Sequence, residues 1–154
     1  MEYMKIVIIC NLPPPAGGAE IFGRDLAVKL PEFGVDVAVI TQNVLELKLR
    51  EANASIRYPY CQQEQRPLYN LGVEIRTQLD EIMRPATLEA RTGLLSAVIS
   101  DLNPELIHCH MPTGVLREAV SASELLGIPV VSTMHGMTNL VPRYDSFYGP
   151  EWSP

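Results

Sequence analysis

The feature that most constrains the fold is a short apolar run followed by a glycine-containing loop and a helical pattern. Residues 6–10 are apolar and mostly β-branched, as is typical of a parallel strand covered on both faces. The loop closes on Gly17 and Gly18, and a helical pattern begins near Ile21. Glycines let a ligand approach the backbone, and the first N–H groups of a helix lack intrahelical partners. This order is compatible with a phosphate site and equally with a plain tight turn.

The helix after this loop should bury one apolar face. Phe22, Leu26, Leu30 and Phe33 recur at spacings of four, four and three residues. Proline inside the pattern and Gly34 after it should end the helix.

The remaining pattern alternates strands with helices. Strands are predicted over residues 35–41, 56–58, 105–110 and 128–134, and helices over residues 71–83, 86–102 and 114–126. The last of these helices should bury an apolar face that contains Val115, Ala119, Ala122 and Leu126. This alternation predicts an α/β fold, namely a Rossmann-like doubly wound parallel sheet in three layers, with strand order 3-2-1-4-5. We expect residues 1–136 to form this domain and residues 137–154 to form an irregular, aromatic and proline-rich tail.

Every histidine of the chain follows or ends a predicted strand. His108 and His110 belong to the fourth strand, and His135 follows the fifth. Ligands of doubly wound sheets bind beyond the carboxyl ends of the strands, where the strand order reverses. We therefore expect the glycine loop and these histidines to face one crevice. We expect His108 and His110 to project from opposite faces of their strand; since no third ligand is evident, we predict no metal site.

Composition limits the class of protein. The 154 residues carry a net charge of −6, which argues against a nucleic-acid binder. Cys10, Cys61 and Cys109 cannot all pair, and two of them lie in apolar runs, which favours small buried thiols in a reducing compartment. No signal peptide or membrane-length apolar run is visible. We expect a cytoplasmic protein, for which peripheral contact with a membrane stays open.

Several stretches resemble the N-terminal domain of group 1 (family 4) glycosyltransferases. They are GGAE at residues 17–20, LA at 26–27, GVDVAVIT at 34–41, PELIHCH at 104–110 and GIPVVSTMHG at 127–136. The resemblance covers both ends of the chain and is poor between about residues 43 and 102.

The resemblance implies the GT-B architecture, in which the active site lies between two Rossmann-like domains. This chain matches only the acceptor-side domain, and residues 137–154 would continue toward a C-terminal domain that binds the nucleotide and carries a Glu-x7-Glu motif. The implied donor is a nucleotide-sugar without a further cofactor, and the implied acceptor is a sugar, a lipid or a glycan. Glu81 and Glu89 also stand eight apart, but they lack the neighbouring glycines of that motif, so we interpret them as surface charges.

The resemblance also assigns roles to residues. Backbone N–H groups of Gly17 and Gly18 would bind the donor diphosphate, whose negative charge grows as the sugar leaves. His135 would be the catalytic residue that contacts the transferred sugar or the acceptor. His110, Glu20 and Gly136 would line the acceptor and sugar crevice. These roles predict the N-terminal half of a retaining glycosyltransferase, inactive without its second domain.

Two other functions stay open at this point. A stand-alone, non-catalytic sugar- or nucleotide-binding module would keep the crevice without the chemistry. A dinucleotide-dependent oxidoreductase is less favoured, because G-x-G-x-x-G is missing and Thr41–Gln42 stand where an acidic residue would end the second strand.

Overall fold

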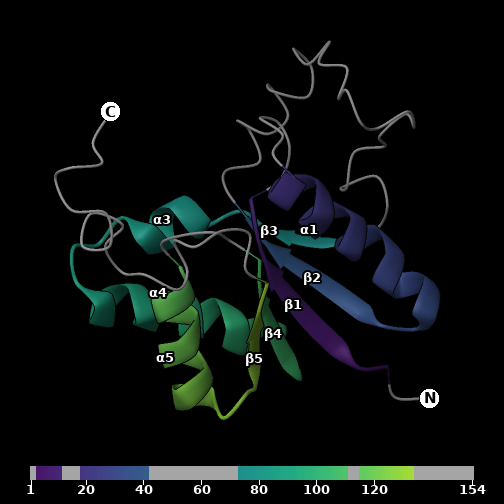
Figure 1. Ribbon diagram of the computed structural model, residues 1–154. Coiled ribbons are helices and arrows are strands. Elements are labelled where there is room, and N and C mark those ends of the chain that lie inside the picture. The colour runs from purple at the N-terminus through teal and green to yellow at the C-terminus, as the bar shows by residue number, and fades with distance from the viewer. Residues whose placement is uncertain (1–2, 12–17, 42–72, 111–114, 134–154) are drawn as a thin grey trace, which may run out of the picture.

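The computed structural model describes residues 3–11, 18–41, 73–110 and 115–133. They contain a five-stranded parallel sheet in the order β3-β2-β1-β4-β5, which confirms the predicted fold class and strand order (Figure 1). The strands are β1 (Lys5–Ile9), β2 (Asp36–Ile40), β3 (Glu74–Arg76), β4 (Leu106–Cys109) and β5 (Val130–Ser132). No helix in the described part of the chain is long and apolar enough to cross a membrane.

Helices cover both faces of the sheet (Figure 1). One face carries α1 (Gly18–Lys29), which packs on the β1 and β2 side chains Ile6, Ile8, Val37 and Val39. The other carries α3 (Leu79–Met83), α4 (Leu88–Leu102) and α5 (Leu116–Leu126). The three layers follow from strand alternation, because successive side chains of each central strand enter opposite apolar clusters.

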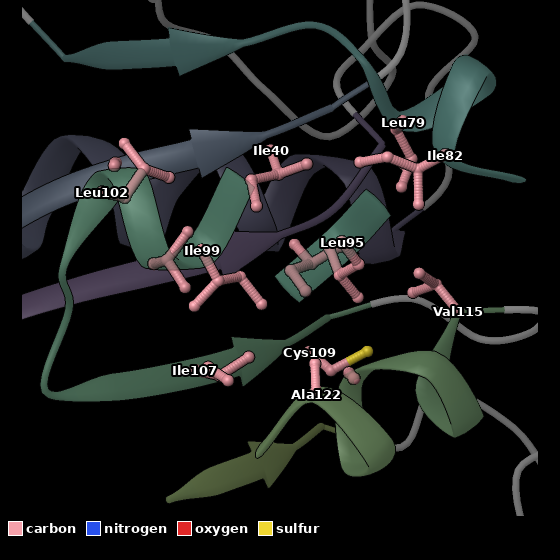
Figure 2. Close-up of a cluster of buried hydrophobic side chains, with 14 residues drawn as sticks. Ile40, Leu79, Ile82, Leu95, Ile99, Leu102, Ile107, Cys109, Val115 and Ala122 are labelled. Atoms are coloured by element: carbon pink, nitrogen blue, oxygen red, sulfur yellow. The ribbon is translucent and has the colours of Figure 1, made fainter. Parts of the chain in front are cut away.

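The core beneath α4 and α5 is the larger of the two apolar clusters (Figure 2). Leu95, Ile99 and Leu102 of α4 point toward the strands, and Ala122 of α5 lies near Cys109. The N-cap of α4 is Thr87, whose side chain accepts a hydrogen bond from the Ala90 N–H. The apolar face predicted for α5 is confirmed, because Val115, Ala119 and Ala122 are buried and Leu126 packs against them.

The predicted end of α1 is confirmed. The helix passes at Leu30–Phe33 into a 3₁₀ turn that contains Pro31, and Gly34 ends this turn in the left-handed region with φ of 76°. The predicted apolar face is wrong in part. Phe22 is 49% exposed and Phe33 is 78% exposed, whereas Gly23 and Ala27 are buried against the sheet. A close approach of helix to strand selects residues without large side chains at the contact.

Glycine substitutions in two helices should separate this close approach from ordinary helix propensity. A Cβ at Gly23 would lie 3.1 Å from Cys10 Cβ and from His110 Cδ2, while a Cβ at Gly93 of α4 would meet nothing within 4 Å. We expect Gly93→Ala to raise the free energy of unfolding by about 0.5–1 kcal/mol. Gly23→Ala should lower it by about 1 kcal/mol, because overpacking outweighs the propensity gain. Urea unfolding measures the change in the free energy of unfolding for each variant. An equal increase in both variants would contradict the close contact at Gly23.

One segment departs from the predicted elements. The helix expected over residues 71–83 is instead β3 followed by the short helix α3. Ile75 pairs with Val39 of β2, and the Thr41 N–H donates to the Arg76 carbonyl at 2.8 Å. Pairing with β2 has therefore overridden local helix propensity. The strand predicted over residues 56–58 and the tail over residues 137–154 lie outside the described residues.

Candidate functional site

The carboxyl edge of the sheet is extended by one residue beyond three strands. The N–H of Cys10, after β1, donates to Ile40 O at 3.1 Å, and the N–H of His110, after β4, donates to Ile9 O at 2.8 Å. The N–H of Thr133, after β5, donates to Cys109 O at 3.1 Å. These bonds fix the backbone from which the candidate site residues project.

The strand order reverses between β1 and β4 at this same edge. The helix that follows β1 lies on one face of the sheet, and α5, which follows β4, lies on the other (Figure 1). At such a point the loops after two neighbouring strands run to opposite faces of the sheet and leave a crevice between them. Doubly wound sheets bind their ligands in this crevice. Gly18 is the first residue of α1 and stands at this point.

The His110 ring is enclosed by residues of α1 and β4. Only 1% of the residue is exposed. Its ring stacks on the Phe22 ring, with centroids 5.1 Å apart and planes at 16°, and its Cδ2 lies close to Gly23. The His108 ring meets it edge-on, with centroids 5.5 Å apart. His110 thus lies at the predicted edge of the sheet but beneath the surface of α1.

The position of His108 corrects one prediction. His108 and His110 were expected on opposite faces of the strand, and this is wrong. Side chains two residues apart along a strand project from the same face, and both rings lie on the α1 side. The His108 Nε2 is 2.7 Å from the Thr133 Oγ1, which ties the end of β5 to the two rings. Within the described residues, no group of three His, Cys, Asp or Glu side chains could hold a metal ion.

Cys10 and Glu20 lie beside this group of rings. Glu20 belongs to the first turn of α1 and is partly buried. Burial, with smaller contributions from the nearby Cys109 and Glu20, raises the pKa of the Cys10 thiol to about 12. Cys10 and Cys109 are both buried, as the sequence predicts, and neither forms a disulfide.

Native Cys10 should resist alkylation. With its pKa moved from 9.0 to about 12, the thiolate fraction at pH 8 falls about a thousandfold, and the thiolate is the nucleophile. We expect iodoacetamide to leave Cys10 unmodified in the folded protein and to modify it in urea, as peptide mass spectrometry would measure. Equal rates in both states would contradict the burial of this thiol.

The structure brings together some of the predicted site residues. Gly18, Glu20 and His110 lie near one another at the carboxyl edge, where α1 begins. Gly17, His135 and Gly136 lie outside the described residues. Glu81 and Glu89 are exposed, as expected of surface charges.

A buried ion pair on the other face of the sheet was not predicted from the sequence. Glu118 in the first turn of α5 is 1% exposed, and its Oε1 accepts a hydrogen bond of 2.6 Å from the Arg91 Nε. The Arg91 Nη1 also donates to the carbonyls of Pro85 and Ala86, at 2.9 and 3.0 Å. Arg91 thereby ties the turn between α3 and α4 to the start of α5.

Comparison with protein families identifies one match over most of the chain. The model of the glycosyl transferase 4-like domain matches residues 17–153. No curated protein matches the sequence.

Solved structures with a similar fold include a glycosyltransferase from Rickettsia africae, which is 13% identical with a TM-score of 0.58 over 97% of this chain and 34% of that chain. MurG from Acinetobacter baumannii is 15% identical with a TM-score of 0.57, over 89% of this chain and 38% of that one. A UDP-N-acetylglucosamine 2-epimerase is 15% identical with a TM-score of 0.52, over 86% of this chain and 33% of that one. At these identities the likeness shows the fold alone, and the chain spans about a third of the length of these proteins.

Proposed function

The chain belongs to the glycosyl transferase 4-like domain family, and we propose that it forms the N-terminal, acceptor-side half of a retaining glycosyltransferase. The donor is a nucleotide-sugar, and the acceptor is a sugar, a lipid or a glycan. The nucleotide is held by a second, C-terminal Rossmann-like domain. The need for such a domain is supported by two similar solved structures, of which this chain covers only 34% and 38%.

The observation that carries this proposal is the meeting of α1 and His110 at the reversal of strand order. The helix that follows β1 in the chain begins at Gly18, and His110 stacks on its second turn from the end of β4. A helix N-terminus attracts anions, and the first N–H groups are free to bind them. The donor diphosphate would therefore lie over the start of α1.

Gly17 and Gly18 stabilise the nucleotide as it leaves the sugar. Backbone N–H groups of Gly17 and Gly18 bind the diphosphate, and fixed dipoles stabilise the charge that it gains as the sugar–phosphate bond breaks. Glu20 and Gly136 line the acceptor and sugar crevice. The Glu20 carboxylate accepts hydrogen bonds from hydroxyl groups.

His135 acts at the reaction centre. A neutral imidazole donates and accepts hydrogen bonds, so it can orient hydroxyls of the transferred sugar or the acceptor. In a retaining reaction of this kind, the donor phosphate takes the acceptor proton, and this half needs no catalytic carboxylate. His110 is 1% exposed and would support the wall of this crevice from beneath α1.

Transfer by the protein from the complete reading frame tests the proposal. UDP- and GDP-sugars are offered with sugar and lipid acceptors, and acceptor-dependent release of the nucleoside diphosphate is measured. We expect transfer with retention of configuration, reduced by about 10²-fold in His135→Ala and unchanged in Phe33→Leu, whose side chain is exposed far from the carboxyl edge. Full activity of His135→Ala would contradict its role.

The same assay addresses a different function. We expect the 154-residue chain alone to transfer no sugar, and transfer by it would contradict the need for a second domain. A complete protein that binds sugars or nucleotides without transfer would be a binding module instead. Because one protein of similar fold is a UDP-N-acetylglucosamine 2-epimerase and one fold can host many activities, epimerised UDP-sugar is measured in the same samples.

A further inference from the structure

We propose that His110 is a positioning residue, which seats the first two turns of α1 on the sheet and thereby sets where the helix N-terminus meets its ligand. The part that concerns the ligand rests on the function proposed above. The placement of the first two turns of α1 by His110 does not depend on that function.

His110 is almost completely buried. An imidazole that is 1% exposed presents almost no surface to a substrate. It influences a bound molecule chiefly through the groups that it contacts. Its backbone is held by the hydrogen bond to Ile9 O, so the ring is a fixed surface at the end of β4.

The contacts of α1 divide along the helix. The second half packs apolar side chains on the sheet, namely Leu26, Ala27 and Val28. In the first half, the contacts with the sheet edge include the Phe22 ring on His110 and the close approach of Gly23 to Cys10 and His110. A flat ring against a flat ring, beside a residue without a side chain, leaves little freedom for that part of the helix.

A second contact links this seat to the end of β5. The His108 ring lies edge-on to His110, and its Nε2 is 2.7 Å from the Thr133 Oγ1. Phe22, His110, His108 and Thr133 therefore form a continuous row from α1 to the residue two positions before His135. Through this row His110 relates the start of α1 to the segment that leads to the proposed reaction centre.

Two pairs of variants distinguish seating from ordinary core packing. His110→Phe keeps a flat ring at the site, whereas His110→Leu keeps an apolar side chain without one. Phe22→Leu removes the stacking partner from a half-exposed position where folding is not at risk. Phe33→Leu is the matched control, because Phe33 is 78% exposed at the far end of the same helical segment.

The readout is the amide spectrum of the ¹⁵N-labelled 154-residue chain without ligand. We expect His110→Leu and Phe22→Leu to shift the amides of residues 19–22, while those of residues 26–29 stay in place. His110→Phe should restore the wild-type positions, and Phe33→Leu should not move them. The inference is overturned if the residue 19–22 amides stay unchanged in Phe22→Leu, or if His110→Phe shifts them as much as His110→Leu.

Titration with inorganic pyrophosphate then tests the ligand part. We expect pyrophosphate to shift the Gly18 and Ala19 amides of the wild type, with a dissociation constant raised at least about threefold in Phe22→Leu, because the attraction of a helix terminus falls off within one turn. Equal constants would overturn the ligand part. If pyrophosphate shifts no wild-type amide, the donor-phosphate role proposed above fails, while the ligand-free spectra still decide the seating.

Discussion

Replacing Arg91 by methionine is expected to lower the free energy of unfolding by roughly 3–5 kcal/mol, because it leaves a buried carboxylate without its charged partner. Glu118 is buried, and the Arg91 Nε donates to its Oε1 at 2.6 Å. The same substitution removes the hydrogen bonds to the carbonyls of Pro85 and Ala86. Urea unfolding followed by circular dichroism measures the loss.

Removing the charges of both Arg91 and Glu118 should lower the free energy of unfolding far less than removing the charge of Arg91 alone. In Arg91→Met combined with Glu118→Leu, apolar side chains replace the ion pair, and such replacements are often neutral. Lys29→Met is the control for an exposed pair, since Lys29 and Glu32 lie 3.1 Å apart with both side chains more than half exposed. Lys29→Met should lower the free energy of unfolding by at most about 0.5 kcal/mol. A similar small loss for Arg91→Met would show that Glu118 is hydrated in the native state.

The sequence contains an indication of the buried Arg91–Glu118 pair, but the spacing of hydrophobic residues alone does not reveal it. Val115, Ala119 and Ala122 were predicted as the buried face of α5, and Glu118 stands on that same face at the intervening helical position. A charged residue inside an apolar stripe should be read as a buried group in need of a partner. Identifying Arg91 as that partner requires the packing of α4 against α5, which no local pattern contains.

The strand order could be predicted because the central strands are buried on both faces. Residues 6–10 and 35–41 are almost continuously apolar, and short helical connections between such runs allow little besides a right-handed parallel arrangement. β3 escaped prediction because only three residues pair, at the edge of the sheet. Glu74 and Arg76 there form ion pairs with Lys5 and Asp101, so this strand lacks a continuous apolar signature.

The candidate site was predictable as a location and only partly as an arrangement of side chains. The family resemblance is confirmed by the match over residues 17–153, and the edge where α1 begins lies where strand topology places it. The burial of His110 under Phe22 was not predictable from spacing, because Phe22 was assigned to the core and Gly23 to no role. Close approach of a helix to a sheet depends on which residues are small, not on which are apolar.

Leu95→Ala is expected to cost about 2–5 kcal/mol, the range for deleting a large buried side chain. Leu95 is fully buried between α4 and the sheet, within the cluster of Figure 2. Its surroundings are strands fixed by parallel pairing and the packed helix α5, so the cavity can collapse only in part. The adjacent Leu94 is 45% exposed, and Leu94→Ala should cost less than about 1 kcal/mol, because little apolar area leaves the interior and alanine favours the helix. Urea unfolding of the two variants compares one chemical change at neighbouring positions, and equal losses would contradict the orientation of α4 in the structure.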